Sequence, residues 1–230
     1  MTALWLTRAQ LRRDAPLAAL APLLVPEGAA PRAATSHRLV WALFADGPDR
    51  RRDFLWREEA PGRFLVLSAR APEDPHGLFD LGCKPFEPNL LPGNRLGFSL
   101  RANPVVARSA GPGQRGKRHD VVMDVLHAVP QGERAAARPE AVLAAGRAWL
   151  ARQGEACGFT PADDIAVDGY DRVSIPRDPG KPAVFGVLDL QGVLAVDDPP
   201  RFLAALCRGF GRARAFGCGL MLIRRARAPW

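Results

Sequence analysis

Residues 208–225 read RGFGRARAFGCGLMLIRR, a loop rich in glycine and arginine that runs directly into an apolar segment. Glycine allows positive φ angles and lets a second backbone approach closely. Successive N–H groups in such a loop, with arginines between them, suit the binding of a phosphate chain. The apolar segment at 220–223 predicts a short buried strand. The loop should therefore be held at the end of a rigid sheet.

A dinucleotide-binding fingerprint is one alternative for this loop, and the spacing excludes it. That fingerprint is G-x-G-x-x-G between a strand and a helix. Its third glycine position is Arg214 here, and the helix-like run at 200–207 precedes the loop instead of following it. Two interpretations remain: a phosphate-binding loop, or a loop whose glycines only permit a tight turn.

The composition indicates a partner with negative charge. The chain has 230 residues and a net charge of +8, with 32 Lys and Arg against 24 Asp and Glu. Only three of the basic residues are lysines, Lys84, Lys117 and Lys181. Arginine binds phosphate in a planar, bidentate way, so a polyanion such as a nucleic acid is the expected partner. The alternative is that the arginine bias reflects the coding composition of the source genome.

The cysteines and the hydropathy pattern indicate a cytoplasmic protein. None of the four cysteines, Cys83, Cys157, Cys207 and Cys218, has C-x-x-C spacing. We therefore predict small core residues in a reducing compartment, with no disulfide and no metal site. No apolar run is long enough to span a bilayer.

The first part of the chain has the pattern of one mixed α+β domain. Strand-like runs and one amphipathic helix alternate, with a degenerate helix at 72–77. The helix should begin at Thr35 or Ser36 as N-cap, after a Pro- and Ala-rich linker at 14–34. The predicted strands are 3–7, 54–56, 64–67 and 79–86. This β-α-β-β-α-β order is the ferredoxin-like plan.

The same order recurs after a linker at 88–93. Predicted strands lie at 96–100, 165–175, 183–196 and 220–223, and predicted helices at 139–153 and 200–207. A basic, glycine-bearing loop at 107–119 interrupts the pattern. The sequence thus predicts an α+β fold of two tandem ferredoxin-like domains, residues 1–92 and 93–230.

His37 is the best candidate for chemistry. It would lie in the first turn of the predicted helix, where the helix dipole lowers the pKa of an imidazole, and it can move a proton at neutral pH. The alternative is that it only packs beside Val40 and Trp41. No group of carboxylates resembles a two-metal nuclease site. Asp120 and Asp124, at helical spacing, fit a solvated helix face.

Several strings resemble the CasE family, the repeat-processing endoribonuclease of type I-E CRISPR systems and a subunit of the Cascade complex. The strings cover most of the chain: HRLVWALF at 37–44, RDFLWR at 52–57, KPF at 84–86, RLGFSLRANP at 95–104, GKR at 116–118, and the glycine-rich stretch 209–220.

The resemblance implies two tandem ferredoxin-like domains and cleavage of a repeat stem-loop without metal or cofactor. The 2′-OH of the RNA attacks the adjacent phosphate and leaves a 2′,3′-cyclic phosphate. The implied partners are precursor and mature CRISPR RNA and the other Cascade subunits, with target DNA met only through the assembled complex and no membrane. The alternative is a non-catalytic subunit that binds structured RNA. A binder of the RRM type is less well supported, because no RNP1 string occurs.

The resemblance also assigns residues. The catalytic histidine is His37, with possible help from Ser36, Arg38 and Lys84, while some relatives have a tyrosine where this chain has Ala34. Tyr170, the only tyrosine, is far away in sequence. The expected RNA-binding residues come from the end of the strand at 96–100, the basic loop at 107–119, the hairpin of the strands at 165–175 and 183–196, and the glycine-rich loop. They are Arg101, Arg115, Lys117, Arg118, Arg172, Arg177, Lys181, Arg208, Gly209, Gly211, Arg212, Arg214, Gly217 and Gly219.

Overall fold

A computed structural model describes residues 4–14, 20–45, 52–109, 111, 116–176 and 180–226. The chain forms two compact units. The first unit contains Met1–Asn89, Val173–Val184 and Ala213–Leu220, and the second contains Leu90–Arg172, Phe185–Arg212 and Met221–Trp230. Two segments distant in sequence therefore complete the unit that the N-terminal part of the chain builds. The boundary between residues 92 and 93 stays a prediction.

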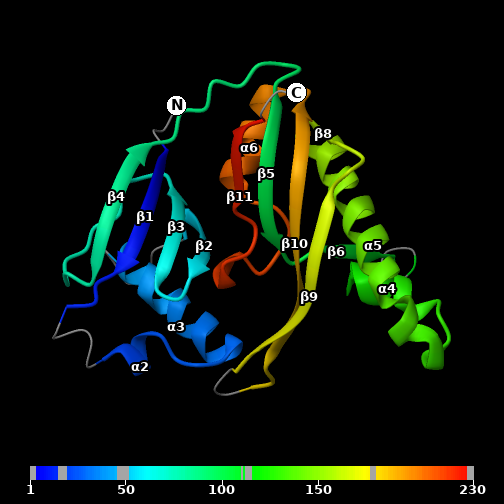
Figure 1. Cartoon of the computed structure of the whole chain (residues 1–230), viewed down its shortest axis with the longest axis horizontal. Helices are drawn as coiled ribbons and strands as arrows, with labels where there is room; N and C mark the ends of the chain where they lie inside the picture. The colour runs from blue at the N-terminus through cyan, green and yellow to red at the C-terminus, as the bar shows by residue number, and fades with distance from the viewer. Residues whose placement is uncertain are drawn as a thin grey trace. The chain divides into compact units, whose positions relative to one another are not determined.

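The first unit contains a four-stranded antiparallel sheet with the order β2-β3-β1-β4 (Figure 1). The strands are β1 (Trp5–Leu11), β2 (Phe54–Ala60), β3 (Arg63–Ser68) and β4 (Phe79–Pro85). β2 and β3 form a hairpin that turns at Gly62, whose φ of 73° suits glycine. The last strand thus pairs with the first, as the ferredoxin-like plan requires.

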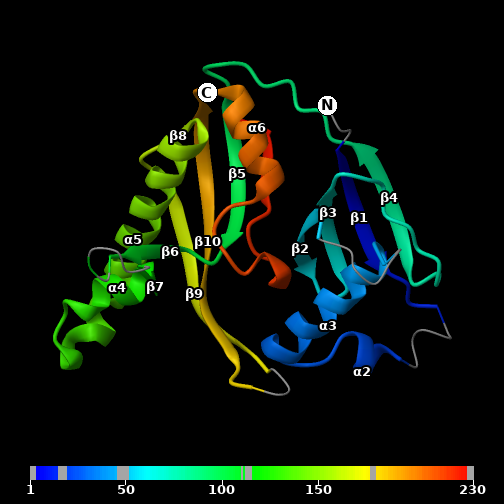
Figure 2. The same cartoon turned by 180° about the vertical axis from the view of Figure 1, so that it is seen from behind.

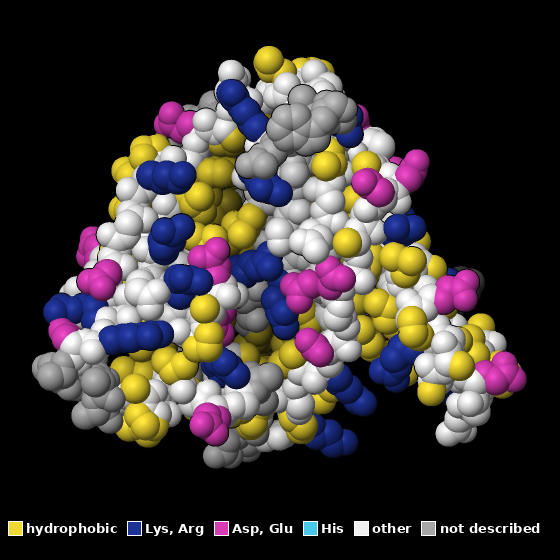
Figure 3. All heavy atoms as spheres, in the orientation of Figure 1, with side chains coloured by type: hydrophobic (Ala, Val, Ile, Leu, Met, Phe, Trp, Pro, Cys, Tyr) yellow, Lys and Arg dark blue, Asp and Glu magenta, His cyan; other side chains and the backbone are white. Residues whose placement is uncertain are grey.

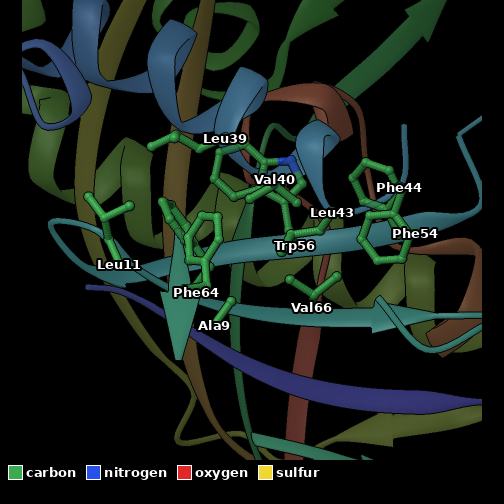
Figure 4. Close-up of a cluster of buried hydrophobic side chains, with 11 residues drawn as sticks. Ala9, Leu11, Leu39, Val40, Leu43, Phe44, Phe54, Trp56, Phe64 and Val66 are labelled. Atoms are coloured by element: carbon green, nitrogen blue, oxygen red, sulfur yellow. The ribbon is translucent and has the colours of Figure 1, made fainter. Parts of the chain in front are cut away.

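One face of this sheet carries the core of the first unit. Alternate residues of the strands point to that face, among them Ala9 and Leu11 of β1 and Phe64 and Val66 of β3. The helix α3 (Ala29–Ala42) lies across the same face, and its Val40, which is fully buried, packs into the cluster (Figure 4). The prediction of an amphipathic helix in this part of the chain is confirmed.

The start of α3 was predicted wrongly. The helix begins at Ala29, with Gly28 as N-cap at a φ of 86°, so neither Thr35 nor Ser36 caps it. A short helix, α2 (Ala21–Leu24), also lies within the predicted linker. The cause is composition: alanine is the best helix former, and Pro31 lies in the first turn, where proline is tolerated.

The predicted helix at 72–77 is absent from the described structure. The side chain of Asp74 accepts hydrogen bonds from the backbone N–H groups of Leu78 and Phe79, at 3.1 and 2.7 Å. Aspartate often competes with a helix in this way, because its carboxylate satisfies nearby backbone donors in a turn.

The second unit repeats the strand order in a larger form. Its sheet has the order β11-β5-β10-β8, and β9 also pairs with β10. Its elements are β5 (Arg95–Ala102), β6 (Val105–Arg108), β7 (Lys117–Asp120), α4 (Val121–His127), η1 (Gln131–Glu133), α5 (Arg134–Cys157), β8 (Phe159–Pro161), β9 (Ala166–Ile175), β10 (Ala183–Val196), α6 (Pro199–Arg208) and β11 (Met221–Arg225). Of these, residues 173–175 of β9 and 183–184 of β10 belong to the first unit. The α+β prediction of tandem ferredoxin-like domains is confirmed.

The helices α5 and α6 cover one face of this sheet and meet each other (Figure 2). Trp149 of α5 and Phe202 of α6 are at most 2% exposed. The ring of Phe159 contacts the rings of Phe202 and Phe210, with centroids 5.3 and 5.9 Å apart. Phe210 thereby fixes the first part of the glycine-rich loop to the core of the second unit.

Sequence reasoning missed the insertion between β5 and α5. The predicted basic loop at 107–119 contains an antiparallel pair, β6 with β7, and α4 follows it directly. The prediction for the cysteines was half right: Cys157 and Cys218 are buried, whereas Cys83 and Cys207 are exposed. No helix in the described part of the chain is both long and apolar enough to cross a membrane.

Candidate active site and nucleic-acid interface

His37 lies in the third turn of α3, half-buried, and not in the first turn as predicted. Two aromatic rings contact its imidazole. The Trp41 ring lies one turn further along the helix, with its centroid 6.2 Å away and nearly perpendicular. The Phe216 ring is tilted by 45° at 5.6 Å. Such edge and tilted contacts between aromatic rings are favourable, so they restrict the orientation of the imidazole.

Phe216 belongs to η2 (Arg214–Phe216), the part of the glycine-rich loop that joins the first unit. This turn packs against α3 and β2. It is flanked by two residues in the left-handed region, Ala213 at a φ of 51° and Gly217 at 76°. A Cβ atom added at Gly217 would lie 3.1 Å from the ring of Trp56. Glycine is needed at 217 both for its backbone angle and for this close approach.

The surroundings of His37 favour the neutral imidazole. Burial is the largest cause that lowers its pKa below 6.5, and the positive charges of Arg52 and Arg38 lower it further. A hydrogen bond with the backbone of Ala215 opposes this and raises the pKa. The ring is therefore mostly neutral at pH 7 and able to accept a proton. The helix dipole is not among the causes, because His37 is too far from the start of α3.

Arg52 is near enough to His37 for its charge to lower the pKa of the imidazole. Arg52 is half-buried directly before β2, and both its burial and the charge of Arg214 lower its pKa. The next residue, Asp53, forms an ion pair with Arg70, from Nε to Oδ2 at 3.1 Å. Arg70 also donates to the backbone oxygen of Phe44 at 2.9 Å. The first unit thus brings the positive charges of Arg38 and Arg52 to His37, and the charge of Arg214 acts on Arg52.

Two of the predicted helpers of His37 lie elsewhere or are enclosed. Lys84 is exposed on β4, next to Leu6 in the register. Phe79 and Leu81 of the same strand pack into the core, so Lys84 points to the face of the sheet opposite α3. Ser36 is only 2% exposed. Of the three predicted helpers, Arg38 is the one whose charge acts on His37.

The first half of the glycine-rich loop belongs to the second unit and is fixed by Asn103. The backbone N–H of Arg212 donates to the Asn103 oxygen at 3.1 Å. A Cβ atom at Gly211, whose φ is 70°, would lie 2.7 Å from that oxygen. The side chain of Asn103 in turn donates to the backbone oxygen of Gly186 at 2.7 Å.

Some of the backbone N–H groups that were expected to bind phosphate already have hydrogen-bond partners within the chain. The N–H groups of Gly209, Arg212 and Phe216 donate to backbone oxygens within the chain. These three cannot also serve a phosphate without breaking those bonds. In the described part of this loop the arginine side chains are the stronger candidates for phosphate contacts, and Arg208 and Arg212 are exposed.

The other predicted RNA-binding residues fall into three groups. Lys117, Arg118, Arg172 and Lys181 are exposed, and Figure 3 shows Lys and Arg side chains spread over the face in view. Arg101 instead forms an ion pair with Asp189 at 2.6 Å. Arg115 and Arg177 lie outside the described residues.

Asp120 and Asp124 have structural partners and do not form a merely solvated face. Asp120 is the N-cap of α4 and accepts from the N–H groups of Val122 and Met123. It also accepts from the hydroxyl of Tyr170 at 2.9 Å, and burial raises the pKa of that hydroxyl. Asp124 pairs with Arg108. Within the described residues, no group of His, Cys, Asp and Glu is arranged to hold a metal ion.

Comparison with known proteins shows the family to which the chain belongs. A family model described as CRISPR associated protein matches residues 4–225. The CRISPR-associated endoribonuclease Cse3 of Thermus thermophilus is 33% identical over 193 residues, which cover 75% of this chain and 80% of the relative. This chain belongs to the CasE (Cse3) family of CRISPR-associated proteins.

Two further proteins of the CasE family are also similar to this chain over most of its length. The Cascade subunit CasE of Escherichia coli is 26% identical over 191 residues, covering 80% of this chain and 88% of the relative. The solved structure of Thermus thermophilus Cse3 bound to an RNA representing a pre-cleavage complex has a TM-score of 0.67 and 26% identity, covering 96% of this chain and 99% of that one.

Sequence reasoning did not single out Arg52 as a functional residue. It stands in a string that resembles the CasE family, but no spacing rule links residue 52 to residue 37 or to residue 214. The only local signal was a pair of charged residues, Arg52 and Asp53, directly before an apolar strand.

Proposed function

We propose that this chain is an endoribonuclease that binds the repeat stem-loop of precursor CRISPR RNA, cleaves it, and stays bound as a subunit of a Cascade complex. Membership of the CasE family supports this, since the relatives include an endoribonuclease and a Cascade subunit. The observation that carries the chemistry is the half-buried His37, whose lowered pKa leaves it neutral among arginines.

In the proposed reaction the nucleophile belongs to the RNA. His37 takes the proton from a ribose 2′-OH, and the 2′-oxygen attacks the adjacent phosphate to give a 2′,3′-cyclic phosphate. A positioned acid or base of this kind contributes about 10²–10⁴-fold to the rate. DNA lacks the 2′-OH, so it would bind without being cut. No metal or other cofactor takes part in this scheme.

The partners follow from the same proposal. The exposed basic residues of the β6–β7 pair, of β9 and of the loop after α6 would contact RNA phosphates. The mature RNA and the other Cascade subunits would be the lasting partners, and target DNA would be met only within the complex. The place of action is the cytoplasm.

Cleavage of a repeat RNA in the presence of EDTA tests the proposal. The repeat is identified from the RNA that copurifies with the protein. We expect cleavage by the native chain with a 2′,3′-cyclic phosphate end, and loss of cleavage with intact binding in His37→Ala. His76→Ala, which removes an exposed histidine of the same unit, serves as the control and should cleave normally. RNA that is bound but stays intact would favour the non-catalytic subunit.

A further inference from the structure

The insertion that contains β6, β7 and α4 is joined to the strand β9 by the side chains of Asp120 and Tyr170. The Tyr170 hydroxyl donates to Oδ1 of Asp120 at 2.9 Å, although the two residues are 50 positions apart in sequence. The same Oδ1 accepts from the backbone N–H groups of Val122 and Met123, at 3.0 and 3.1 Å. A single oxygen therefore begins α4 and links the insertion to a strand of the sheet.

The backbone of β10 lies against this contact. A Cβ atom added at Gly186 would lie 2.1 Å from Oδ2 of Asp120 and 2.7 Å from the ring of Tyr170. Only glycine leaves room there for both side chains. The side-chain amide of Asn103 donates to the Gly186 oxygen at 2.7 Å, and Arg138 of α5 lies over the Tyr170 ring, with Cζ 5.9 Å from its centroid. The strands β7, β9 and β10 and the helix α5 thus meet at this contact.

Capping of α4 does not by itself explain a carboxylate at position 120. Oδ2 of Asp120 is buried and has no hydrogen-bond partner among the described residues, which costs free energy. Serine caps a helix about as well and has no second oxygen to bury. Burial and the negative charge of Asp120 raise the pKa of the Tyr170 hydroxyl, so this group remains a donor at neutral pH. The reach of the carboxylate to Tyr170 accounts for its presence.

An exposed arginine stands two residues from each partner of this contact. Arg118 precedes Asp120 on β7, and Arg172 follows Tyr170 on β9. Side chains two positions apart on a strand leave the same face, about 7 Å from each other. Each arginine therefore lies on the same face of its strand as the hydrogen-bonded side chain beside it. The contact sets where the charges of the insertion stand relative to those of β9.

We propose that Asp120 and Tyr170 form a clamp that fixes the β6–β7 pair against β9, so that Arg118 and Arg172 contact the backbone of one RNA together. The identification of the ligand as RNA rests on the proposed function. Asp120 and Tyr170 are positioning residues, since they act through the two arginines. Charges that are already in place avoid the cost of being ordered when the RNA binds. Loss of the clamp should therefore weaken binding without removing any positive charge.

The first test removes one oxygen atom from the clamp. Tyr170→Phe keeps the ring, the cap of α4 and the net charge of the protein. We expect it to bind the repeat RNA about tenfold more weakly, as the loss of one hydrogen bond to a charged group can produce. Thr160→Val is the matched control, because the Thr160 hydroxyl also donates to a carboxylate of the second unit, that of Asp197 at 2.8 Å. It should bind RNA as the native protein does.

A double-mutant cycle shows whether the clamp acts through Arg118. In the native background, Arg118→Ala should reduce the slope of log K against log salt concentration by about 0.7–0.9. In the Tyr170→Phe background the same substitution should change the slope much less, because the insertion no longer holds Arg118 against the RNA. A loss of stability alone would not produce this coupling. Effects of the two substitutions that simply add would overturn the clamp.

Asp120→Ser separates the clamp from the cap and from the charge. Serine can still cap α4, but its side chain is too short to reach Tyr170 as well. Removal of a carboxylate by itself strengthens binding to a polyanion, whereas loss of the clamp weakens it. We expect weaker binding of the repeat RNA, measured at a temperature where thermal unfolding shows that each variant is folded. Binding tighter than that of the native protein would contradict the proposal.

The clamp and the proposed function fail in different ways. Because the clamp acts on binding, Tyr170→Phe should cleave at the native single-turnover rate once the RNA is saturating. A slower rate with native affinity would overturn the clamp. Native protein that binds and cleaves the repeat RNA, together with Tyr170→Phe that binds as tightly, would overturn the clamp and leave the proposed function standing. Native protein that binds no repeat RNA would overturn both.

Discussion

His37 combines two properties at the scale of the residue: its pKa is below 6.5, and its ring is restricted by Trp41 and Phe216. If the neutral imidazole is the base, the cleavage rate should rise with pH, with the midpoint of the rise below pH 6.5. The rate should then be constant between about pH 7 and 8. The measurement is the single-turnover rate at limiting RNA across this range, under conditions where chemistry is slower than binding. A midpoint above 7 would contradict a neutral base in the free protein.

The same lowered pKa affects stability. Above pH 6.5 His37 is neutral in both the folded and the unfolded chain and contributes no pH dependence. Below pH 6.5 the unfolded chain binds a proton that the folded chain resists, so the free energy of unfolding falls until the pH passes the folded pKa. We expect His37→Asn to lose less stability than the native protein between pH 7.5 and 5.0 in urea unfolding. His76→Asn is the control, and equal losses in native protein and His37→Asn would refute the effect.

At the scale of the element, η2 connects the glycine-rich loop to the site. Gly217→Ala should destabilise the first unit by about 1–3 kcal/mol, because alanine is strained in the left-handed region. It should also displace η2, since its Cβ would lie 3.1 Å from Trp56. Gly93→Ala is a matched control, with a φ of 81° and nothing within 4 Å of the added Cβ. Only Gly217→Ala should lose RNA cleavage beyond its loss of stability.

Comparison of elements shows what local patterns predict and where they fail. The strands follow from apolar residues at every second position, and the apolar face of α3 with Val40 follows from apolar residues every three to four positions. Both patterns involve only residues that are near each other in sequence. The start of α3 was missed because Thr35 and Ser36 look like caps, while the alanines before them are strong helix formers. Residues 213–220 join the first unit through contacts with α3 and β2. Such non-local packing leaves no periodic signal, so the action of Arg214 on Arg52 was not foreseen.

At the scale of the whole molecule, the net charge of +8 predicts RNA binding that weakens steeply with salt. Each phosphate contact that is lost should reduce the slope of log K against log salt concentration by about 0.7–0.9. Arg172→Ala and Lys181→Ala, which remove exposed charges, should each reduce the slope by this amount. Arg101→Ala should change it less, because Arg101 is already paired with Asp189 at 2.6 Å. The test is the RNA affinity of each variant at salt concentrations between about 50 and 300 mM. An unchanged slope would remove that residue from the RNA interface.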